Sequence, residues 1–188
     1  MLDPVLHLGA VALLVLVFGT AVASKLPTLL EFEGVVGNYR LLPDRAVPLV
    51  ARLVVSVEAL TVLLLVVPTA RDWGAAAALG LLVLFAAAMA INMRRGRFEI
   101  DCGCFRTTHR QRLSWWLVGR NAALALAAAA LWLPLSRAPL TFDYVHAALG
   151  GTVLYLVYLG GSQILLPRPP SFDENFESSR RAAELQEM

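Results

Sequence analysis

Five long apolar stretches dominate the 188-residue chain and indicate its structural class. They cover residues 5–24, 46–70, 73–93, 114–135 and 144–166. Each is about as long as the roughly 20 residues that an α-helix needs to cross the hydrocarbon core of a bilayer. The pattern therefore predicts an all-α integral membrane bundle of about five transmembrane helices. One domain is expected over residues 1–166, followed by a proline-containing polar tail, 167–188, that we expect to be disordered.

A short amphipathic helix is expected in the polar connection after the first stretch. Four residues recur there at helical spacing: Phe32, Val35, Val36 and Tyr39. Pro27 and Pro43 bracket this segment, and prolines commonly mark the boundaries of helices. A short helix with one such face is typical of a segment that lies in the membrane interface.

Basic residues alternate along the chain in the manner of a membrane topology signal. Of the sixteen Lys and Arg residues, twelve fall in the connections before and after alternate apolar stretches, six of them within residues 94–112. Arg71 and Arg137 alone occupy the two intervening connections. The positive-inside rule then predicts an N-terminus outside the cell, with residues 94–112 and the C-terminus in the cytoplasm. No soluble basic domain accompanies these charges, so lipid is the expected partner and nucleic acid is not.

The cysteines Cys102 and Cys104 are separated by Gly103 alone, within the basic segment "RRGRFEIDCGCFRTTHRQRL". Gly103 permits the backbone bend that brings the two thiols together. A disulfide that closes so small a ring is strained and exchanges readily. The neighbouring arginines favour the reactive thiolate, whereas Asp101 opposes it. The segment therefore predicts a reversible dithiol–disulfide pair.

Two other interpretations of the cysteines stay open from the residues alone. Two thiolates suit copper(I) or zinc, and His109 follows in Cys-x-Cys-x4-His spacing, but a closed zinc site needs four ligands. Alternatively the segment is inert, because a free cysteine often behaves as a small apolar side chain. No metal ligand is assigned on this basis.

Several ionisable or amide side chains lie inside the apolar stretches, where they are costly and usually functional. Glu58 is near the middle of the second stretch and must be protonated or paired, for example with Arg120. Arg120 and Asn121 lie early in the fourth stretch, and Asn92 closes the third. Arg52 and Arg120 are both near the same membrane face and could extend to it along their apolar stems. The alternation of spans gathers these groups at the end that carries the cysteines.

The sequence resembles the methylamine utilisation protein E (MauE) family. The resemblance is most specific in "INMRRGRFEIDCGCF", followed by "LSWWLVGRNAALAL". The "SKL" that ends the first stretch and the "NYRLLP" before the second are also similar to that family. By position, five residues match the family pattern: Glu58, Cys102, Cys104, Arg120 and Asn121.

This resemblance implies a multi-pass protein of the bacterial inner membrane, with a four-helix core plus one helix, related to small redox membrane proteins. It implies a role in the maturation of methylamine dehydrogenase, whose small (β) subunit is rich in disulfides. A thioredoxin-like, membrane-anchored protein is the implied companion.

Together, the residues and the resemblance predict a membrane thiol–disulfide redox protein. If it acts as a thiol–disulfide oxidoreductase, the expected catalytic residues are Cys102, Cys104 and Arg120. Arg120 would hold a thiolate or the head group of a membrane quinone. Supporting roles are expected for Asn121, Glu58, Asn92, Asp101 and Gly103. The competing hypothesis is a non-enzymatic membrane chaperone or transport component for the dehydrogenase subunit, or a protein that handles copper or zinc.

Overall fold

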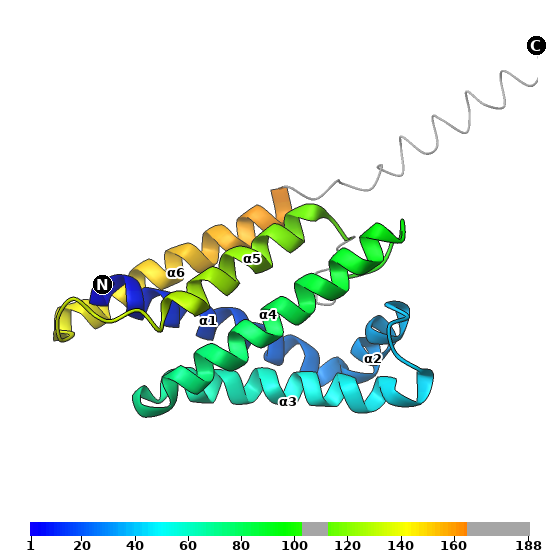
Figure 1. The fold of residues 1–188 in the computed structure, drawn as a ribbon, viewed down its shortest axis with the longest axis horizontal. Coiled ribbons are helices and arrows are strands. Elements are labelled where there is room, and N and C mark those ends of the chain that lie inside the picture. The colour runs from blue at the N-terminus through cyan, green and yellow to red at the C-terminus, as the bar shows by residue number, and fades with distance from the viewer. Residues whose placement is uncertain (103–112, 165–188) are drawn as a thin grey trace, which may run out of the picture.

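The computed structural model describes residues 1–102 and 113–164, and within them the chain is helical without a β-strand. The α-helices are α1 (Pro4–Lys25), α2 (Leu29–Asn38), α3 (Val47–Val66), α4 (Arg71–Arg94), α5 (Trp115–Ala130) and α6 (Thr141–Ile164). This architecture, shown in Figure 1, confirms the all-α fold class. The tail predicted to be disordered, 167–188, lies outside the described residues.

In the described part of the chain, four helical segments are long and apolar enough to cross a membrane: Pro4–Asn38, Asp44–Val66, Pro68–Arg94 and Thr141–Gly161. Helix α5 has only 16 residues, or about 24 Å of helix, which is less than a typical hydrocarbon core of about 30 Å. The predicted stretch 114–135 thus overestimates this helix. Pro134 explains the early end, since proline cannot donate a backbone hydrogen bond to a continuing helix. The chain is a multi-pass membrane protein with one short helix.

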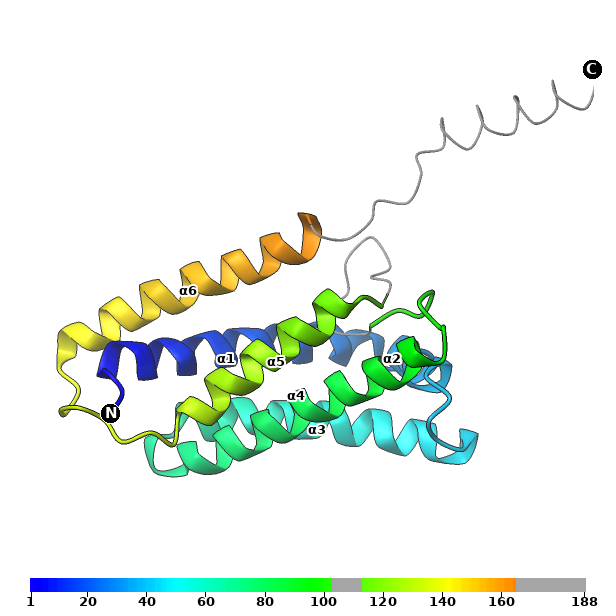
Figure 2. The ribbon, with the colours of Figure 1, turned by 45° about the horizontal axis from the view of Figure 1, so that its top comes forward.

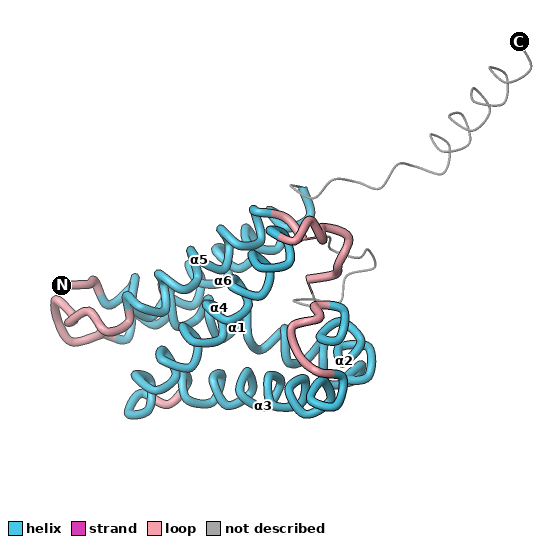
Figure 3. The backbone as a smooth tube through the Cα atoms, turned by 45° about the vertical axis from the view of Figure 1, so that its right-hand side comes forward, coloured by secondary structure: helices cyan, strands magenta, loops and turns pink. Residues whose placement is uncertain are grey.

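The long helices alternate in direction and form an up-and-down bundle (Figures 1 and 2). Helix α1 packs along α6 and α3, and α4 packs along α5 and α3. The N-terminus and the α5–α6 connection lie at one end of the bundle. Helix α2 and Cys102 lie at the other end, called here the cysteine end. Figure 3 shows the connections gathered at these two ends, so residues distant in sequence meet there.

Glycine sets the separation of the two helices with the most extensive contact. A Cβ atom on Gly151 of α6 would lie 2.6 Å from the Cβ of Ala12 and 3.1 Å from the carbonyl oxygen of Gly9, both on α1. Such distances are too short for any side chain, so α1 and α6 approach as closely as their backbones allow. Small residues serve this purpose in membrane bundles, where close packing replaces the hydrophobic driving force of water.

Two apolar clusters fill the bundle. The larger joins α1, α3, α4 and α5, and its least exposed members include Leu14, Phe18, Leu65, Leu82 and Leu124. The smaller lies at the cysteine end and contains Met89, Met93, Ile100, Cys102, Leu113 and Leu117. The smaller cluster packs the residues on both sides of the Cys-Gly-Cys segment against α4 and α5.

An ion pair fixes the opposite end. The Arg137 Nη1 and Nη2 atoms donate to the Asp143 carboxylate at 2.6 and 2.8 Å, next to the start of α6. The Asp143 carboxylate also accepts a hydrogen bond from the Leu140 backbone N–H at 2.7 Å, which caps the helix. The hydrogen bond to Asp143 raises the pKa of Arg137 above its usual range, since the carboxylate favours the charged guanidinium.

Candidate functional site

Both ends of the segment that carries the cysteines are tied down. Asn92, at the end of α4, is fully buried and its side-chain oxygen accepts a hydrogen bond from Arg97 Nη1 at 3.2 Å. On the far side of the segment, the Leu113 N–H lies 3.1 Å from the carbonyl oxygens of both Phe98 and Ile100. Hydrogen bonds therefore hold the residues just after α4 and just before α5 in place. We call this region the base of the cysteine segment. Asn92 thus anchors the start of this segment, and its supporting role in function stays a prediction.

Cys102 follows this base directly in the sequence, two residues after Ile100, and it is 8% exposed. Its backbone carbonyl oxygen accepts a hydrogen bond from the Tyr39 hydroxyl at 3.3 Å, which joins it to the end of α2. Asp101 faces a different space, an open polar cleft that it lines with Glu31 and Glu99. Gly103, Cys104 and His109 lie outside the described residues, so the Cys102–Cys104 disulfide stays a prediction.

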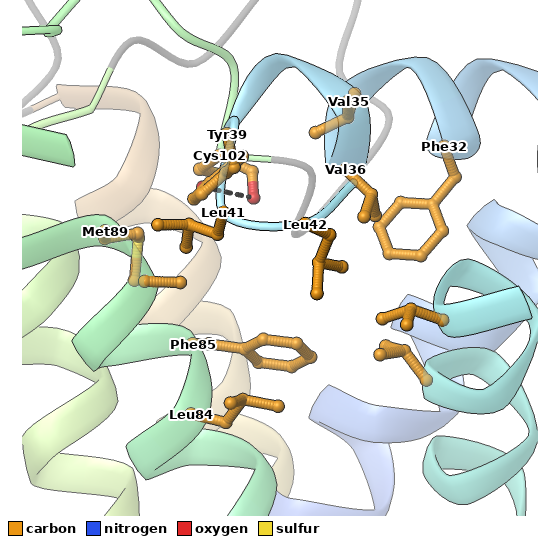
Figure 4. Close-up of a pocket in the computed structure, with 13 residues that line it drawn as sticks. Phe32, Val35, Val36, Tyr39, Leu41, Leu42, Leu84, Phe85, Met89 and Cys102 are labelled. Carbon is orange, nitrogen blue, oxygen red and sulfur yellow. Dashed lines mark hydrogen bonds between the residues drawn. The ribbon is translucent and has the colours of Figure 1, made fainter. Parts of the chain in front are cut away.

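An apolar pocket of about 210 Å³ lies between α2, α3 and α4 at the cysteine end; we call it the Cys102 pocket (Figure 4). Its lining residues are Phe32, Val35, Val36, Tyr39, Leu41, Leu42, Val50, Val54, Leu84, Phe85, Ala88, Met89 and Cys102. The helix predicted after the first stretch is confirmed as α2. All four residues of its predicted apolar face line this pocket, so α2 forms one wall of the pocket, and α3 and α4 form others.

A buried ion pair lies between α1 and α3. Lys25 Nζ donates to Glu58 Oε1 at 2.5 Å, and the two side chains are 6% and 1% exposed. The ammonium also lies 4.7 Å from the centroid of the Phe32 ring and 5.3 Å from that of Phe85, where cation–π attraction adds to the pairing. Glu58 is therefore paired, but with Lys25 and not with Arg120, the partner that the sequence suggested as an example. The antiparallel packing of α1 and α3 brings the last residue of α1 to Glu58 instead.

The second oxygen of Glu58 faces a small cavity. Among the residues that the structure describes, Oε2 has no hydrogen-bond partner. The adjacent cavity is about 20 Å³ and is lined by Lys25, Glu58, Asn121 and Tyr158 together with apolar side chains. That volume is about enough for one water molecule, which needs roughly 10–15 Å³.

Arg120 is buried on α5, 7% exposed, with its guanidinium carbon 4.6 Å from the centroid of the Tyr158 ring. None of its three guanidinium nitrogens has a hydrogen-bond partner within residues 1–102 and 113–161. Asn121 is also buried and donates to the Leu117 carbonyl oxygen at 3.0 Å. Arg52 behaves differently: its side chain is 64% exposed and lies 3.5 Å from Glu33. The sequence suggested that both Arg52 and Arg120 could extend to the membrane surface. The structure leaves Arg52 exposed and buries Arg120.

These charges leave the interior with an excess of one positive charge. Lys25 and Glu58 neutralise each other, whereas Arg120 has an aromatic ring as its neighbour and no carboxylate within ion-pair distance in the described chain. A buried cation in a membrane bundle is costly unless it is paired, and it favours a nearby anion. The site is therefore suited to a negatively charged group that forms or binds close to α5.

Sequence reasoning missed three contributors: Lys25, Tyr39 and Tyr158. Lys25 was counted only as a topology signal, although a lysine that ends an apolar stretch opposite a buried glutamate is a pairing signal. The partners of Cys102 and Arg120, Tyr39 and Tyr158, depend on helix packing and have no local signal. In the described residues no three His, Cys, Asp or Glu side chains gather as a metal site, but Cys104 and His109 are not among those residues.

The model of one protein family, described as methylamine utilisation protein MauE, matches residues 3–134, which include α1 to α5. The chain belongs to the MauE family. It is 44% identical to methylamine utilization protein MauE of Paracoccus versutus, over 90% of this chain and 93% of that one. It is 43% identical to the MauE protein of Methylorubrum extorquens, over 83% of this chain and 86% of the relative. No solved structure matches the chain.

Membership of the MauE family implies a role in methylamine utilisation and confirms the resemblance seen in the sequence. Every candidate site residue falls inside the region that the family model matches, including Glu58, Asn92, Cys102 and Arg120. The buried Lys25 falls inside it as well. Helix α6, which supplies Tyr158 beside Arg120, begins after that region ends.

Proposed function

We propose that this protein is a membrane thiol–disulfide redox protein that assists maturation of the methylamine dehydrogenase small subunit or of a similar exported client. The observation that carries the proposal is the fixed position of Cys102. It is buried beside an apolar pocket, its carbonyl is held by Tyr39, and the segment that continues to Cys104 has a hydrogen-bonded base. An inert surface loop has no need for this anchoring.

The chemistry is a pair of thiol–disulfide exchanges. The thiolate of one cysteine, Cys102 or Cys104, attacks a sulfur of the partner disulfide and forms a mixed disulfide, and the other partner sulfur leaves as a thiolate and is protonated. The second cysteine then attacks the mixed disulfide and releases the partner as a dithiol. The partner gains two electrons and two protons, and this chain gains the Cys102–Cys104 disulfide. The reverse sequence oxidises the partner.

Arg120 stabilises the cysteine thiolate, the negatively charged species in each exchange step. A guanidinium with no carboxylate partner in the described chain is available to a thiolate, and a nearby cation favours that form over the thiol. Tyr158 holds the guanidinium in place through its ring face. Lys25 cannot substitute for Arg120, because its charge is already neutralised by Glu58.

The partner and the location are part of the proposal. The protein sits in the bacterial inner membrane and works with a thioredoxin-like, membrane-anchored protein that shuttles reducing or oxidising equivalents to the client. The charge pattern supports an N-terminus outside the cell and a cysteine end in the cytoplasm. Electrons then reach a periplasmic client through the membrane partner.

Counting thiols tests the redox proposal. The full-length protein, unfolded in denaturant so that burial does not block the thiols, is treated with a mass-tag maleimide before and after reduction, alongside the Cys102→Ser and Cys104→Ser variants. We expect no tag on the oxidised wild type, two after reduction, and one on either single variant whatever its treatment. If both wild-type thiols stay open to tagging under conditions that oxidise ordinary dithiols, the redox proposal fails.

A second measurement separates redox work from transport. In cells that carry the Cys102→Ser/Cys104→Ser variant, we expect the client to reach its compartment but to lack its disulfides. A client that keeps correct disulfides yet is not exported would instead point to a chaperone or transport component.

A further inference from the structure

We propose that the Cys102 pocket binds the ring of a lipid-soluble quinone, which accepts the electrons released when Cys102 and Cys104 form their disulfide. The electron-transfer half of this inference rests on the proposed function. The binding half does not, because it depends on the pocket alone.

The pocket has the size and lining for a single substituted ring. Its volume is about 210 Å³, whereas an apolar cavity of about 150 Å³ in another protein is known to hold benzene. Phe32 from α2 and Phe85 from α4 both line it, and flat rings stack favourably on aromatic side chains (Figure 4). Tyr39 lines the pocket as well, and its hydroxyl, which donates to the Cys102 carbonyl oxygen at 3.3 Å, ties the pocket wall to the segment that carries the cysteines.

The charge of the lining selects the class of acceptor. No charged side chain lines the pocket in the described chain. A charged acceptor such as an oxidised nicotinamide nucleotide or glutathione disulfide would lose its hydration there without compensation. A quinone is uncharged, dissolves in the membrane and accepts two electrons, the number that a dithiol releases on oxidation.

The pocket is reachable from the lipid phase. Leu42 and Leu84 line the pocket, and both are also exposed at the surface of the bundle. Helix α2, which forms one wall, has no fully buried residue. An isoprenoid tail can therefore lie along the outer surface of the bundle while the ring occupies the pocket beside Cys102.

The sequence suggested Arg120 as the residue that would hold a thiolate or a quinone head group. Arg120 does not line the Cys102 pocket. A cavity lined by its neighbours Asn121 and Tyr158 measures about 20 Å³, too small for a ring. The acceptor is therefore assigned to the pocket, and the stabilisation of negative charge to Arg120 on α5.

The step balances. The Cys102 and Cys104 thiols lose two protons and two electrons as the S–S bond forms. The two carbonyl groups of the quinone gain them and become the hydroxyl groups of the hydroquinone. Of the two cysteines, Cys102 is the one that the structure describes, and it lines the pocket, so the exchange with the ring is assigned to its sulfur.

Paired variants test binding with decylubiquinone and the purified full-length protein in detergent. Ala88 lines the pocket, whereas its neighbour Ala87 on α4 is exposed on the outside. We expect Ala88→Phe to weaken binding at least about tenfold, the effect of roughly 1.4 kcal/mol, and Ala87→Phe to leave it unchanged. Val36→Trp fills the pocket from α2 and provides a second test that leaves the bundle core intact. Decylubiquinone affinity unchanged in both Ala88→Phe and Val36→Trp overturns the assignment of the pocket.

Two further arms separate this inference from the proposed function. The Cys102→Ser/Cys104→Ser variant should still bind decylubiquinone, because the pocket is kept. Reduced wild type should convert one decylubiquinone to its quinol per protein and become disulfide-bonded, and Ala88→Phe should do so at least about ten times more slowly. A protein whose Cys102–Cys104 disulfide is reduced by a soluble dithiol, but whose thiols never reduce the quinone, would overturn the inference and leave the proposed function standing.

Discussion

Lys25 Nζ and Glu58 Oε1 lie 2.5 Å apart across the contact between α1 and α3, with both side chains almost fully buried. Lys25 is the last residue of α1, where the partial negative charge of the helix end adds to the attraction of the carboxylate. Phe32 and Phe85 present ring faces to the same ammonium. The Lys25 ammonium therefore contacts side chains from α2, α3 and α4, and joins these helices to α1.

Removing one member of this pair should destabilise the bundle strongly. We expect Lys25→Met or Glu58→Leu to lower the free energy of unfolding by about 3 kcal/mol or more, because each leaves an unpaired buried charge. The double variant Lys25→Met/Glu58→Leu should be more stable than either single variant, since no charge is left unpaired. Unfolding in a detergent titration measures all three as a double-mutant cycle.

The exposed pair of Arg52 and Glu33 provides the matched control. These atoms are 3.5 Å apart and Arg52 is largely exposed, so Arg52→Met should change stability by less than about 1 kcal/mol. Additive effects of the Lys25 and Glu58 substitutions would show that the two groups are not coupled, contrary to the structure.

The apolar pattern predicted the fold well because helix length and lipid burial are local properties of a sequence. Residues 5–24 became Pro4–Lys25 and residues 73–93 became Arg71–Arg94, within a few residues. The partner of Glu58 could not be read in the same way. A glutamate inside a span demands a partner, but the choice between Lys25 and Arg120 depends on which helices are neighbours and on their relative height.

The contact between α1 and α6 makes adjacent glycines behave differently. An added methyl group at Gly151 would collide with Ala12, whereas one at Gly150 would meet nothing within 4 Å. We expect Gly151→Ala to cost about 1–3 kcal/mol through overpacking. Gly150→Ala should be neutral or slightly stabilising, since alanine favours helix. Thermal unfolding of the two variants side by side checks this, and equal stability would show that α1 and α6 are not in such close contact.

Arg120 should behave as a functional residue whose removal does not harm the fold. Its guanidinium is buried without a hydrogen-bond partner in the described chain, so Arg120→Leu should leave stability unchanged or raise it. Thiol–disulfide exchange should nevertheless slow by about tenfold, which corresponds to roughly 1.4 kcal/mol of lost stabilisation. Arg120→Lys should retain part of the rate, because the positive charge is kept. The measurements are detergent unfolding and the rate of reduction by a small dithiol.

The exposed arginine serves again as the comparison. Arg52→Leu removes the same kind of side chain at the same end of the bundle, and it should leave the exchange rate unchanged. A slower rate in both variants would indicate a general loss of positive potential, and a normal rate in Arg120→Leu would leave Arg120 without a role in exchange.

Asn92 should control how firmly the cysteine segment is held. Asn92→Leu keeps a side chain that branches at Cγ, although a bulkier one, and removes the hydrogen bond to Arg97 that closes the base of the segment. Cys102 is buried, so reduced wild type should react slowly with a maleimide at this position. We expect the variant to react several times faster, with Arg95→Leu, at an exposed residue directly after α4, unchanged. Equal rates would show that apolar packing alone holds the segment.

The candidate site was only partly predictable, because some of its features depend on how the helices pack against one another. Asn92, Arg120 and Cys102 were recognised because polar residues and cysteines stand out within apolar sequence. The Cys102 pocket has no such signal, since it is a space between residues that look like ordinary lipid-facing or core positions. Whether Val36 or Ala88 faces a void depends on the tilt of α2 over α3 and α4, which only the packed structure fixes.

Membrane orientation provides the last prediction, and the structure sharpens the test. Lys25 is neutralised by Glu58 and no longer counts as a topological charge, yet six arginines still lie within residues 94–112. Moving so many charges across a membrane is costly, so the cysteine end should face the cytoplasm. Cys102 is a poor reporter because it is buried. Exposed, uncharged positions serve better: Asn38 at the cysteine end and Ser136 at the opposite end.

Asn38→Cys and Ser136→Cys are each introduced into the Cys102→Ser/Cys104→Ser background, so that one thiol reports one end without altering any charge. Intact cells are treated with a membrane-impermeant maleimide, and lysed cells provide the total. We expect the Ser136→Cys protein to be labelled before lysis and the Asn38→Cys protein only after it. The opposite result would place the cysteine end in the periplasm, where disulfides persist, and the client could then meet Cys102 and Cys104 directly. The basic segment would in that case owe its arginines to thiol chemistry, because positive charge favours the thiolate on either side of the membrane.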